Sequence, residues 1–344
     1  MKSWDVIVIG GGIIGLSLSI ELRKRGLTVL IVERREPGQE ASHAAAGMLA
    51  DCGDETPAIV QPLAKASAQM YPEFVHELQD ESGINVDLRD EGTLVLSSFP
   101  RDPSESIPLQ DLEPALRAPK LSAILLKERS VDPRSLGAAA LKAAKHRGVD
   151  IDSGSPVAQL TINGCTVSGV ITDKSSYSSA AVVNCAGAWA GGIPPLAFPT
   201  RPVKGQMLAV AAPKTLRHVI RAPEVYFVPR SNGRVLIGST LEDTGYDKRV
   251  DPETINRMHR AAIDLCPALE QAKVLEAWAG LRPGTVDDLP ILGGTSLSGY
   301  FVAAGHYRDG ILLAPITARV MSQVVSGQNP DLDISPFSAS RFEL

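Results

Sequence analysis

Three glycines are spaced as in a turn that binds a dinucleotide. The segment Gly10-x-Gly12-x-x-Gly15 directly follows an apolar, β-branched run at residues 4–9. In such a turn the first glycine permits a sharp bend, the second lets the backbone approach a pyrophosphate, and the third lets helix and strand pack closely. Free N–H groups at the start of the next helix then face the phosphates. The spacing therefore predicts a dinucleotide site.

An acidic residue stands where the ribose of such a dinucleotide would lie. Glu33 ends a second apolar run, 28–32, and follows Gly15 by eighteen positions. A carboxylate at this place binds a ribose hydroxyl and disfavours a 2′-phosphate, although Arg34 and Arg35 come directly after it. The motif by itself leaves both FAD and NAD open as the ligand.

A second segment, far away in the sequence, favours FAD. Residues 303–315 have the pattern of a strand, a glycine turn and a helix. The helix N-terminus near Gly310 would point at a flavin carbonyl and favour the reduced, anionic flavin. A strand–turn–helix that merely closes the fold has the same pattern. Residues 41–50 are small and crowded, which fits either an ordinary helix start or a surface on which a flat ligand lies.

The elements that would position these residues follow from apolar periodicity. The chain begins with a βαβ unit, continues through a β-rich middle and returns to alternating helix and strand, while residues 100–120 are rich in proline and indicate a loop. We expect helices over 16–25, 61–82, 134–147, 252–265 and 311–326, and strands over 4–9, 28–32, 93–97, 203–210, 225–229, 234–238 and 299–304, with short strands in 150–171 and a buried strand that runs into glycine over 181–190.

This order predicts an α/β protein (α+β overall), with a Rossmann-like FAD-binding domain into which a mainly antiparallel β-sheet substrate domain is inserted. The FAD-binding domain is expected to be discontinuous. We assign it residues 1–80, 131–195 and 280–344, and we assign the substrate-binding domain residues 81–130 and 196–279.

Composition excludes several other classes. The net charge is −5 and the basic clusters are short, so a nucleic-acid partner is not expected. The four cysteines form no C-x-x-C pair, so neither a disulfide framework nor a zinc site is expected, and free thiols suit the cytoplasm. The most apolar stretch, residues 6–20, is interrupted by glycines and is too short to cross a membrane, and it lacks the cleavage site of a signal peptide.

Six segments together resemble the D-amino-acid oxidase superfamily and, within it, the glycine oxidases of thiamine biosynthesis. They stand in the family's order from one end of the chain to the other, and the Ala-Ala-Ala-Gly-Met-Leu and Gly-His-Tyr-Arg stretches are the most specific. These segments are residues 5–15, 42–49, 202–206, 226–230, 278–285 and 305–315.

The resemblance implies a non-covalent FAD. It places the small-residue loop along the flavin ring and the backbone of Val157 near the adenine, while His306 would order the backbone or meet the flavin edge rather than act as a base. The residues expected to bind the cofactor are Gly10, Gly12, Ile13, Ile14, Gly15, Glu33, Arg34, Ser42, Ala46, Gly47, Met48, Val157, His306, Tyr307, Arg308, Asp309, Gly310, Ile311 and Leu312.

The resemblance also implies a substrate site at the flavin. Arg282 would form a bidentate pair with the substrate carboxylate, with help from Tyr226 and Arg308. Guanidinium suits this role because it is planar, always charged and offers two parallel donors. One position departs from the family pattern: Asp309 stands where asparagine is common. Its carboxylate would either point to solvent or pair with Arg308 and weaken substrate binding.

The implied activity is oxidative deamination of glycine, sarcosine and small D-amino acids to an imino acid, and then to a keto acid and ammonia. Molecular oxygen would become hydrogen peroxide, and no protein side chain or metal would serve as catalyst because the flavin takes the hydride. The glycine imine would feed thiazole synthesis, and the family suggests a homotetramer. The alternatives are a dehydrogenase of the same fold that acts on D-amino acids or sarcosine and reduces a quinone, a non-catalytic FAD-bound scaffold, and an NAD-dependent dehydrogenase.

Overall fold

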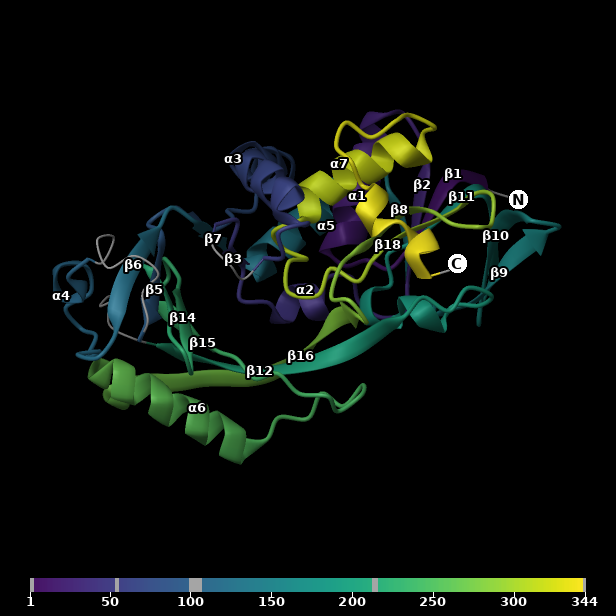
Figure 1. Ribbon diagram of the computed structural model, residues 1–344. Helices are drawn as coiled ribbons and strands as arrows, with labels where there is room; N and C mark the ends of the chain where they lie inside the picture. The colour runs from purple at the N-terminus through teal and green to yellow at the C-terminus, as the bar shows by residue number, and fades with distance from the viewer. Residues whose placement is uncertain (1–2, 53–55, 99–106, 212–215, 343–344) are drawn as a thin grey trace.

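A computed structural model describes residues 3–52, 56–98, 107–211 and 216–342. The mixed α/β architecture is as predicted, with an eight-stranded mixed sheet, a seven-stranded mainly antiparallel sheet and a small three-stranded sheet. Figure 1 shows the helical layer over the first sheet, and the second sheet extending away from it.

The eight-stranded sheet is parallel at its centre. Its order is β17-β18-β11-β1-β2-β8, and the antiparallel meander β9–β10 joins it through β11. The central strands are apolar on both faces, as a sheet covered on both sides requires. The strands are β1 (Ser3–Ile9), β2 (Val29–Glu33), β8 (Asp150–Ser153), β9 (Val157–Asn163), β10 (Thr166–Thr172), β11 (Ser176–Asn184), β17 (Ile291–Gly294) and β18 (Tyr300–Ala304).

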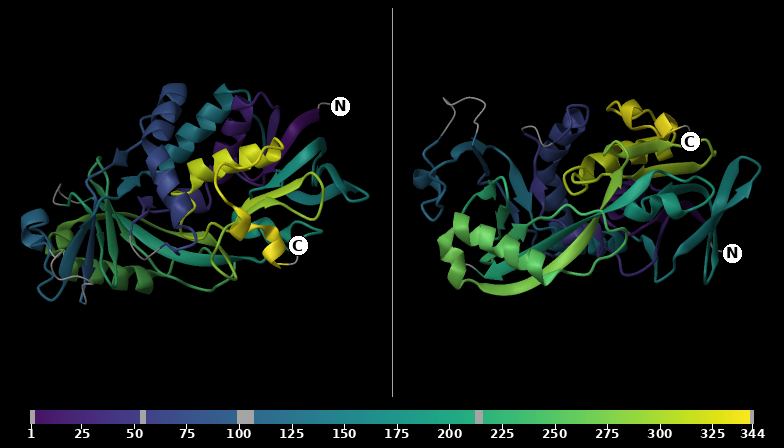
Figure 2. Two further views of the ribbon diagram at one scale, coloured as in Figure 1. Left: turned by 45° about the horizontal axis from the view of Figure 1, so that its top comes forward. Right: turned by 60° about the horizontal axis from the view of Figure 1, so that its bottom comes forward.

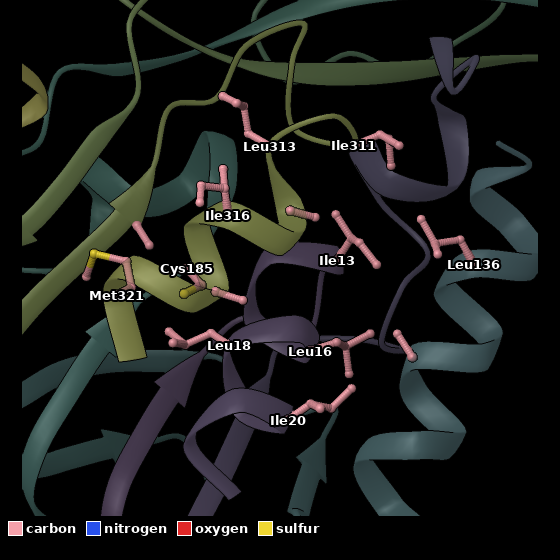
Figure 3. Packing of buried hydrophobic residues seen from close by; sticks show 14 of the residues in the cluster. Ile13, Leu16, Leu18, Ile20, Leu136, Cys185, Ile311, Leu313, Ile316 and Met321 are labelled. Carbon is pink, nitrogen blue, oxygen red and sulfur yellow. The ribbon is translucent and has the colours of Figure 1, made fainter. Parts of the chain in front are cut away.

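Four helices cover one face of this sheet. They are α1 (Ile13–Lys24), α3 (Gln61–Ser82), α5 (Pro133–His146) and α7 (Ala314–Val325). Figure 3 shows apolar side chains from α1, from α7 and from the turn that leads into α7. Ile13, Leu16 and Ile20 belong to the same buried cluster as Ile311, Leu313, Ile316 and Met321. The first and last parts of the chain therefore share one core.

The seven-stranded sheet has the order β16-β12-β15-β14-β13-β5-β6. Its two long strands, β12 and β16, run side by side from this sheet toward the parallel sheet, and the amphipathic helix α6 covers the opposite face from the helical layer (Figures 1 and 2). The elements are β5 (Thr93–Ser97), β6 (Ser122–Leu126), β12 (Thr200–Ala211), β13 (Val219–Arg221), β14 (Tyr226–Pro229), β15 (Arg234–Gly238), α6 (Pro252–Leu265) and β16 (Lys273–Thr285).

Short elements connect the two larger sheets. The three-stranded sheet joins β3 (Met48–Leu49), β7 (Arg129–Val131) and β4 (Leu88–Arg89), and it begins inside the small-residue segment. That segment also contains the one-turn helix α2 (Ala41–Ala44), and the 3₁₀ helix η2 (Gly187–Gly192) follows β11. The remaining pieces are α4 (Leu109–Leu112), η3 (Pro267–Gln271), η4 (Ser335–Phe337) and η5 (Ala339–Phe342).

Several expected boundaries were wrong. The last helix begins at Ala314 rather than at Ile311, because residues 310–313 form turns in which the Leu313 N–H donates to the Asp309 carbonyl. Residues 100–106 of the expected loop lie outside the described residues, and the remainder contains α4. Strands β6 and β16 were not predicted as strands. Both depend on pairing with partners distant in the sequence, which apolar periodicity does not report.

The expected domain boundaries stay a prediction. Strand β16 crosses the boundary placed between residues 279 and 280, so one continuous strand would serve both domains.

All four cysteines are free thiols: Cys185 and Cys266 are buried, and Cys165 is exposed. Within the described ranges, no helix combines the length and the apolar character needed to cross a membrane.

Candidate functional site

A cavity of about 430 Å³ runs between the two larger sheets. One end is walled by the turn after β1, the end of β2 and the start of β9, and the other by strands β12, β14 and β16 of the second sheet. The loop after β18 and the small-residue segment line the part in between. The cavity thus gathers segments that are far apart in the sequence.

The glycine turn is built by close backbone packing. A Cβ added at Gly15 would collide with the carbonyl oxygen of Gly10, and one at Gly10 would lie 2.6 Å from the carbonyl oxygen of Cys185. At Gly12, by contrast, a Cβ would meet only Ser42 Oγ, at 3.4 Å. Ser42 Oγ also accepts a hydrogen bond of 3.0 Å from the Ile13 N–H. Gly12 therefore leaves space on the cavity side of the turn for a ligand.

Glu33 ties this turn to the end of β2. Its carboxylate accepts hydrogen bonds from the Gly11 N–H at 2.7 Å and from the Arg35 N–H at 2.9 Å, and the side chain is buried. Arg34 does not remain in solvent, because its guanidinium bonds Glu40 at 2.7 Å and lies 3.4 Å from the ring centroid of Trp189. Both acids at this end of the cavity are therefore already engaged.

Trp189 is a wall residue that the sequence analysis did not single out. Its ring stacks on Tyr246 with centroids 5.3 Å apart, and the Tyr246 hydroxyl donates to the Ala188 carbonyl at 3.0 Å. Lys248 adds a 2.8 Å ion pair to Glu40. The segment between β15 and α6 is thereby fastened to the first sheet. The signal that was available is the Gly187-Ala188-Trp189 stretch after a buried strand.

The small-residue loop is held from behind by two side chains of the second sheet. Buried Arg230 donates to the Ala46 carbonyl at 2.5 Å, and Trp278 Nε1 donates to the Ala44 carbonyl at 3.0 Å. Burial lowers the pKa of Arg230 to about 10, which leaves it charged at neutral pH. A Cβ at Gly280 would fall on Ala44, so the strand lies directly against the loop. Sequence reasoning gave neither Arg230 nor Trp278 a role.

The Arg282 guanidinium lies at the substrate end and packs directly over Gly205. A Cβ at Gly205 would fall on its guanidinium. The guanidinium donates to Ser239 Oγ at 2.7 Å and to the Thr240 carbonyl at 3.2 Å. Burial lowers the pKa of Arg282, yet no carboxylate of the described residues forms an ion pair with it. The guanidinium also forms part of the cavity wall.

Tyr226, on strand β14 of the same sheet, lies near Arg282 at the cavity wall. Its ring packs on Gly238, where an added Cβ would lie 2.5 Å from the hydroxyl oxygen. Burial raises the pKa of Tyr226, whereas Ser239 and the nearby arginines act in the opposite direction. The phenol therefore stays protonated at neutral pH and can donate a hydrogen bond.

The loop after β18 brings Arg308 to the same end of the cavity. Arg308 is exposed at the mouth, and in the described part of the chain it forms no ion pair with its neighbour Asp309. His306 is buried, burial lowers its pKa to about 4, and its Nε2 lies 3.1 Å from Thr317 Oγ1. A neutral, hydrogen-bonded histidine suits the expected backbone-ordering role.

Most predicted site residues reach the cavity wall, and three do not. Gly15 packs beneath Gly10, Leu312 is buried in the core with its carbonyl accepting from Ser67 Oγ, and Asp309 contributes backbone hydrogen bonds to its own turn. The predicted residues on the wall are Gly10, Gly12, Ile13, Ile14, Glu33, Arg34, Ser42, Ala46, Gly47, Met48, Val157, Tyr226, Arg282, His306, Tyr307, Arg308, Gly310 and Ile311.

The residues present fit FAD. The open side of Gly12 and the start of α1 suit a pyrophosphate, and Glu33 lies at the end of β2 where a ribose would be bound. The middle of the cavity is walled by alanines and glycines from two segments, which leaves room for a flat ring. The fold and this cavity define a protein of the dinucleotide-binding oxidoreductase class, in which a parallel sheet can seat the dinucleotide.

The chain belongs to the FAD dependent oxidoreductase family DAO, whose family model matches residues 5–324. This confirms the resemblance seen in the motifs, and FAD is the cofactor. The chain is similar to the glycine oxidase of Geobacillus kaustophilus, with 34% identity covering 98% of this chain and 97% of the relative. The crystal structure of glycine oxidase from Geobacillus kaustophilus superposes with a TM-score of 0.92 at 32% identity over 99% of both chains.

A second group of relatives is longer. The bifunctional protein ThiO/ThiG of Trichormus variabilis is 34% identical over 98% of this chain, and the match covers 55% of that protein. The chain therefore spans about half the length of these bifunctional relatives.

Proposed function

We propose that this protein deaminates glycine and other small amines oxidatively, with sarcosine and D-alanine as further substrates. The observation that supports this most strongly is Arg282, a partly buried guanidinium without a carboxylate partner among the described residues, next to the hydroxyl of Tyr226. A cation in this state favours an anion from solution, and a carboxylate matches its geometry.

The side chains of this site act by binding and orientation. Ser239 Oγ and the Thr240 carbonyl hold the Arg282 guanidinium in place at the cavity wall, where a substrate carboxylate would reach it. Tyr226 donates a further hydrogen bond to the substrate carboxylate. Fixing the carboxylate leaves the α-carbon of a small amino acid few orientations, which lowers the entropic part of the barrier.

FAD, when bound, would supply the two-electron redox chemistry that couples oxidation of the amine to reduction of oxygen. The overall reaction for glycine is glycine plus O₂ and water to glyoxylate, ammonia and hydrogen peroxide. The similarity to ThiO/ThiG supports a role in making the imine for thiazole synthesis. The alternative is a dehydrogenase of this fold that acts on D-amino acids or sarcosine and reduces a quinone.

Three related proposals accompany the activity. The discontinuous division into domains, with 81–130 and 196–279 forming the substrate-binding part, is supported by the strands that line the substrate end. A homo-oligomer, a tetramer by family resemblance, and a cytoplasmic location complete the proposal.

The test is anaerobic mixing of the purified protein with glycine, sarcosine, D-alanine and D-proline while the visible flavin band is followed. Bleaching by glycine, with peroxide formed when air is admitted, is the expected result. Bleaching without peroxide would favour the quinone-linked dehydrogenase, and bleaching only by the bulkier D-amino acids would change the substrate. A flavin that none of these amines reduces would contradict the proposal.

A further inference from the structure

The segment of residues 239–251, which joins β15 to α6, connects the second sheet with the nucleotide end of the cavity. We call this segment the strap. Its described residues contain no helix and only an isolated β-bridge, in which the backbone of Glu242 pairs with that of Lys204 on β12. Farther along the strap, Tyr246 contacts Trp189 and Lys248 contacts Glu40. The strap is therefore fastened at the nucleotide end by side chains rather than by sheet pairing.

The first fastening is an aromatic stack. The rings of Tyr246 and Trp189 lie 5.3 Å apart, centroid to centroid, with 24° between their planes, and the Tyr246 hydroxyl donates to the Ala188 carbonyl. Tyr246 is 53% exposed, and neither ring belongs to the buried apolar clusters of the described residues. The stack thus contributes little to the core, but it restricts the orientation of Trp189, which forms part of the cavity wall.

The second fastening is an ion pair with the residue that precedes the small-residue loop. Lys248 Nζ lies 2.8 Å from the Glu40 carboxylate, which also bonds Arg34 at 2.7 Å. Partial burial by itself raises the pKa of Glu40, but hydrogen bonds from Lys248 and Arg34 lower that pKa overall, so the carboxylate is charged at neutral pH. The Glu40 carbonyl accepts from the His43 and Ala44 N–H groups and so begins α2. Lys248 therefore holds the start of the loop.

Arg34 links the two fastenings. Its guanidinium bonds Glu40 and also lies 3.4 Å from the ring centroid of Trp189. Arg34, Glu40 and Trp189 line the cavity, whereas Tyr246 and Lys248 are not part of its wall and contact these lining residues from the strap. A wall residue that moves aside has to leave its partners, so these contacts oppose any opening of the nucleotide end.

We propose that Tyr246 and Lys248 are positioning residues for the cofactor, which hold Trp189 and Glu40 in place at the nucleotide end and so slow the release of FAD. Neither side chain needs to touch FAD, because each acts through a residue of the wall. The inference goes beyond the proposed function, since it does not depend on which amine is oxidised. It gives a segment that leaves the second sheet a role in retaining the cofactor.

The test measures the release of FAD from the holoprotein in the absence of any substrate. The protein is strongly diluted, and the rise in fluorescence of free FAD is followed with time. Tyr246→Ala should speed release about two- to tenfold, which corresponds to the loss of one aromatic pair. Lys248→Gln should speed it about two- to fivefold, because this ion pair is partly exposed. The double variant should show the largest acceleration, since the two side chains hold different wall residues.

Conservative variants should preserve slow release. Tyr246→Phe keeps the stack and loses only the hydrogen bond to Ala188, while Lys248→Arg keeps the charge, and each should release FAD within about twofold of the rate of the unaltered protein. Added salt should speed release from the unaltered protein more than from Lys248→Gln, because salt screens an ion pair that the variant lacks. A side chain that only stabilised the fold would not produce this difference in salt dependence.

Two controls separate this role from a general loss of stability or of charge. Ile237→Val trims a buried residue of the second sheet's core outside the cavity wall, and Arg249→Gln removes a charge from a strap residue that is 90% exposed and paired with Asp247. Neither control should change the release rate. Unchanged release in both Tyr246→Ala and Lys248→Gln would overturn the inference, and so would an equal acceleration in Ile237→Val. The proposed amine oxidation is tested separately, because no amine is present in this measurement.

Discussion

The charged side chains at the nucleotide end of the cavity have partners within the protein, whereas those at the substrate end lack a carboxylate partner in the described part of the chain. At the nucleotide end the charged wall residues Glu33, Arg34 and Glu40 have partners within the protein. Glu33 bonds two backbone N–H groups, and Glu40 pairs with Arg34 and with Lys248. At the substrate end Arg282 and Arg308 lack a carboxylate partner among the described residues.

This difference fits the occupants that we propose for the two ends. A cofactor that stays bound benefits from a rigid binding site whose shape is set by the backbone and by glycines. The protein then needs little reorganisation when the cofactor binds. A substrate that enters and leaves at every turnover can bring the missing countercharge with it. Losing an unpaired cation should therefore affect substrate affinity, whereas changing the glycine seat should affect the cofactor.

The largest expected effect follows from removing the inner cation. Arg282→Ala should raise KM for glycine by about 10²- to 10⁴-fold, since two charge-assisted hydrogen bonds of about 1.5–3 kcal/mol each are lost. FAD content, measured from the visible spectrum, should not change. Unchanged KM would show that Arg282 does not anchor the substrate, and loss of FAD would show that the two ends are not independent.

The matched test of the nucleotide end uses two neighbouring glycines. Gly12→Ala leaves the apoprotein intact because the new Cβ meets only Ser42 Oγ at 3.4 Å, but it should prevent close approach of the pyrophosphate and abolish FAD retention. Gly10→Ala places a Cβ 2.6 Å from the Cys185 carbonyl at a φ of +104° and should destabilise the apoprotein itself. Thermal unfolding of the two apoproteins checks this. Full FAD retention by Gly12→Ala would contradict the assignment.

A smaller effect concerns His306 in the loop after β18, whose burial should make the stability of the fold depend on pH. Burial lowers the pKa of His306 to about 4 from 6.5, so the unfolded chain binds a proton more readily between these values. Stability should be fully present above pH 6.5 and should fall as pH drops toward 4, by about 3 kcal/mol at most. Denaturant unfolding of the protein and of His306→Gln at pH 5 and pH 7.5 tests this. An equal pH slope in both would assign the loss to other groups.

The smallest expected effect concerns the residue that orients Arg282. Ser239→Ala removes the 2.7 Å hydrogen bond to the guanidinium and should raise KM for glycine about tenfold, with little change in kcat. Ser239→Thr keeps the hydroxyl and should recover most of the affinity. A fall in kcat with KM unchanged would instead place Ser239 in the chemical step.

The local geometry of the glycine turn could be predicted because its determinants are neighbours in the sequence. The turn from Gly10 to Gly15, the strand before it and Glu33 form one βαβ unit, in which backbone sterics and apolar periodicity decide the local geometry. The family motifs added the prediction that the cofactor is FAD and that Arg282 binds the substrate. The loop after β18 was also recognised from sequence, although its helix begins later than expected.

Only the tertiary structure decided which side chains from distant segments of the sequence contact each other. Ser239 at Arg282, Arg230 behind Ala46 and Tyr246 on Trp189 each join residues from different elements. Strand β16 exists through its pairing with β12, and it sets Arg282 against Gly205. Such contacts depend on three-dimensional packing, because a side chain's type gives its chemistry whereas its partner is fixed by how the sheets meet.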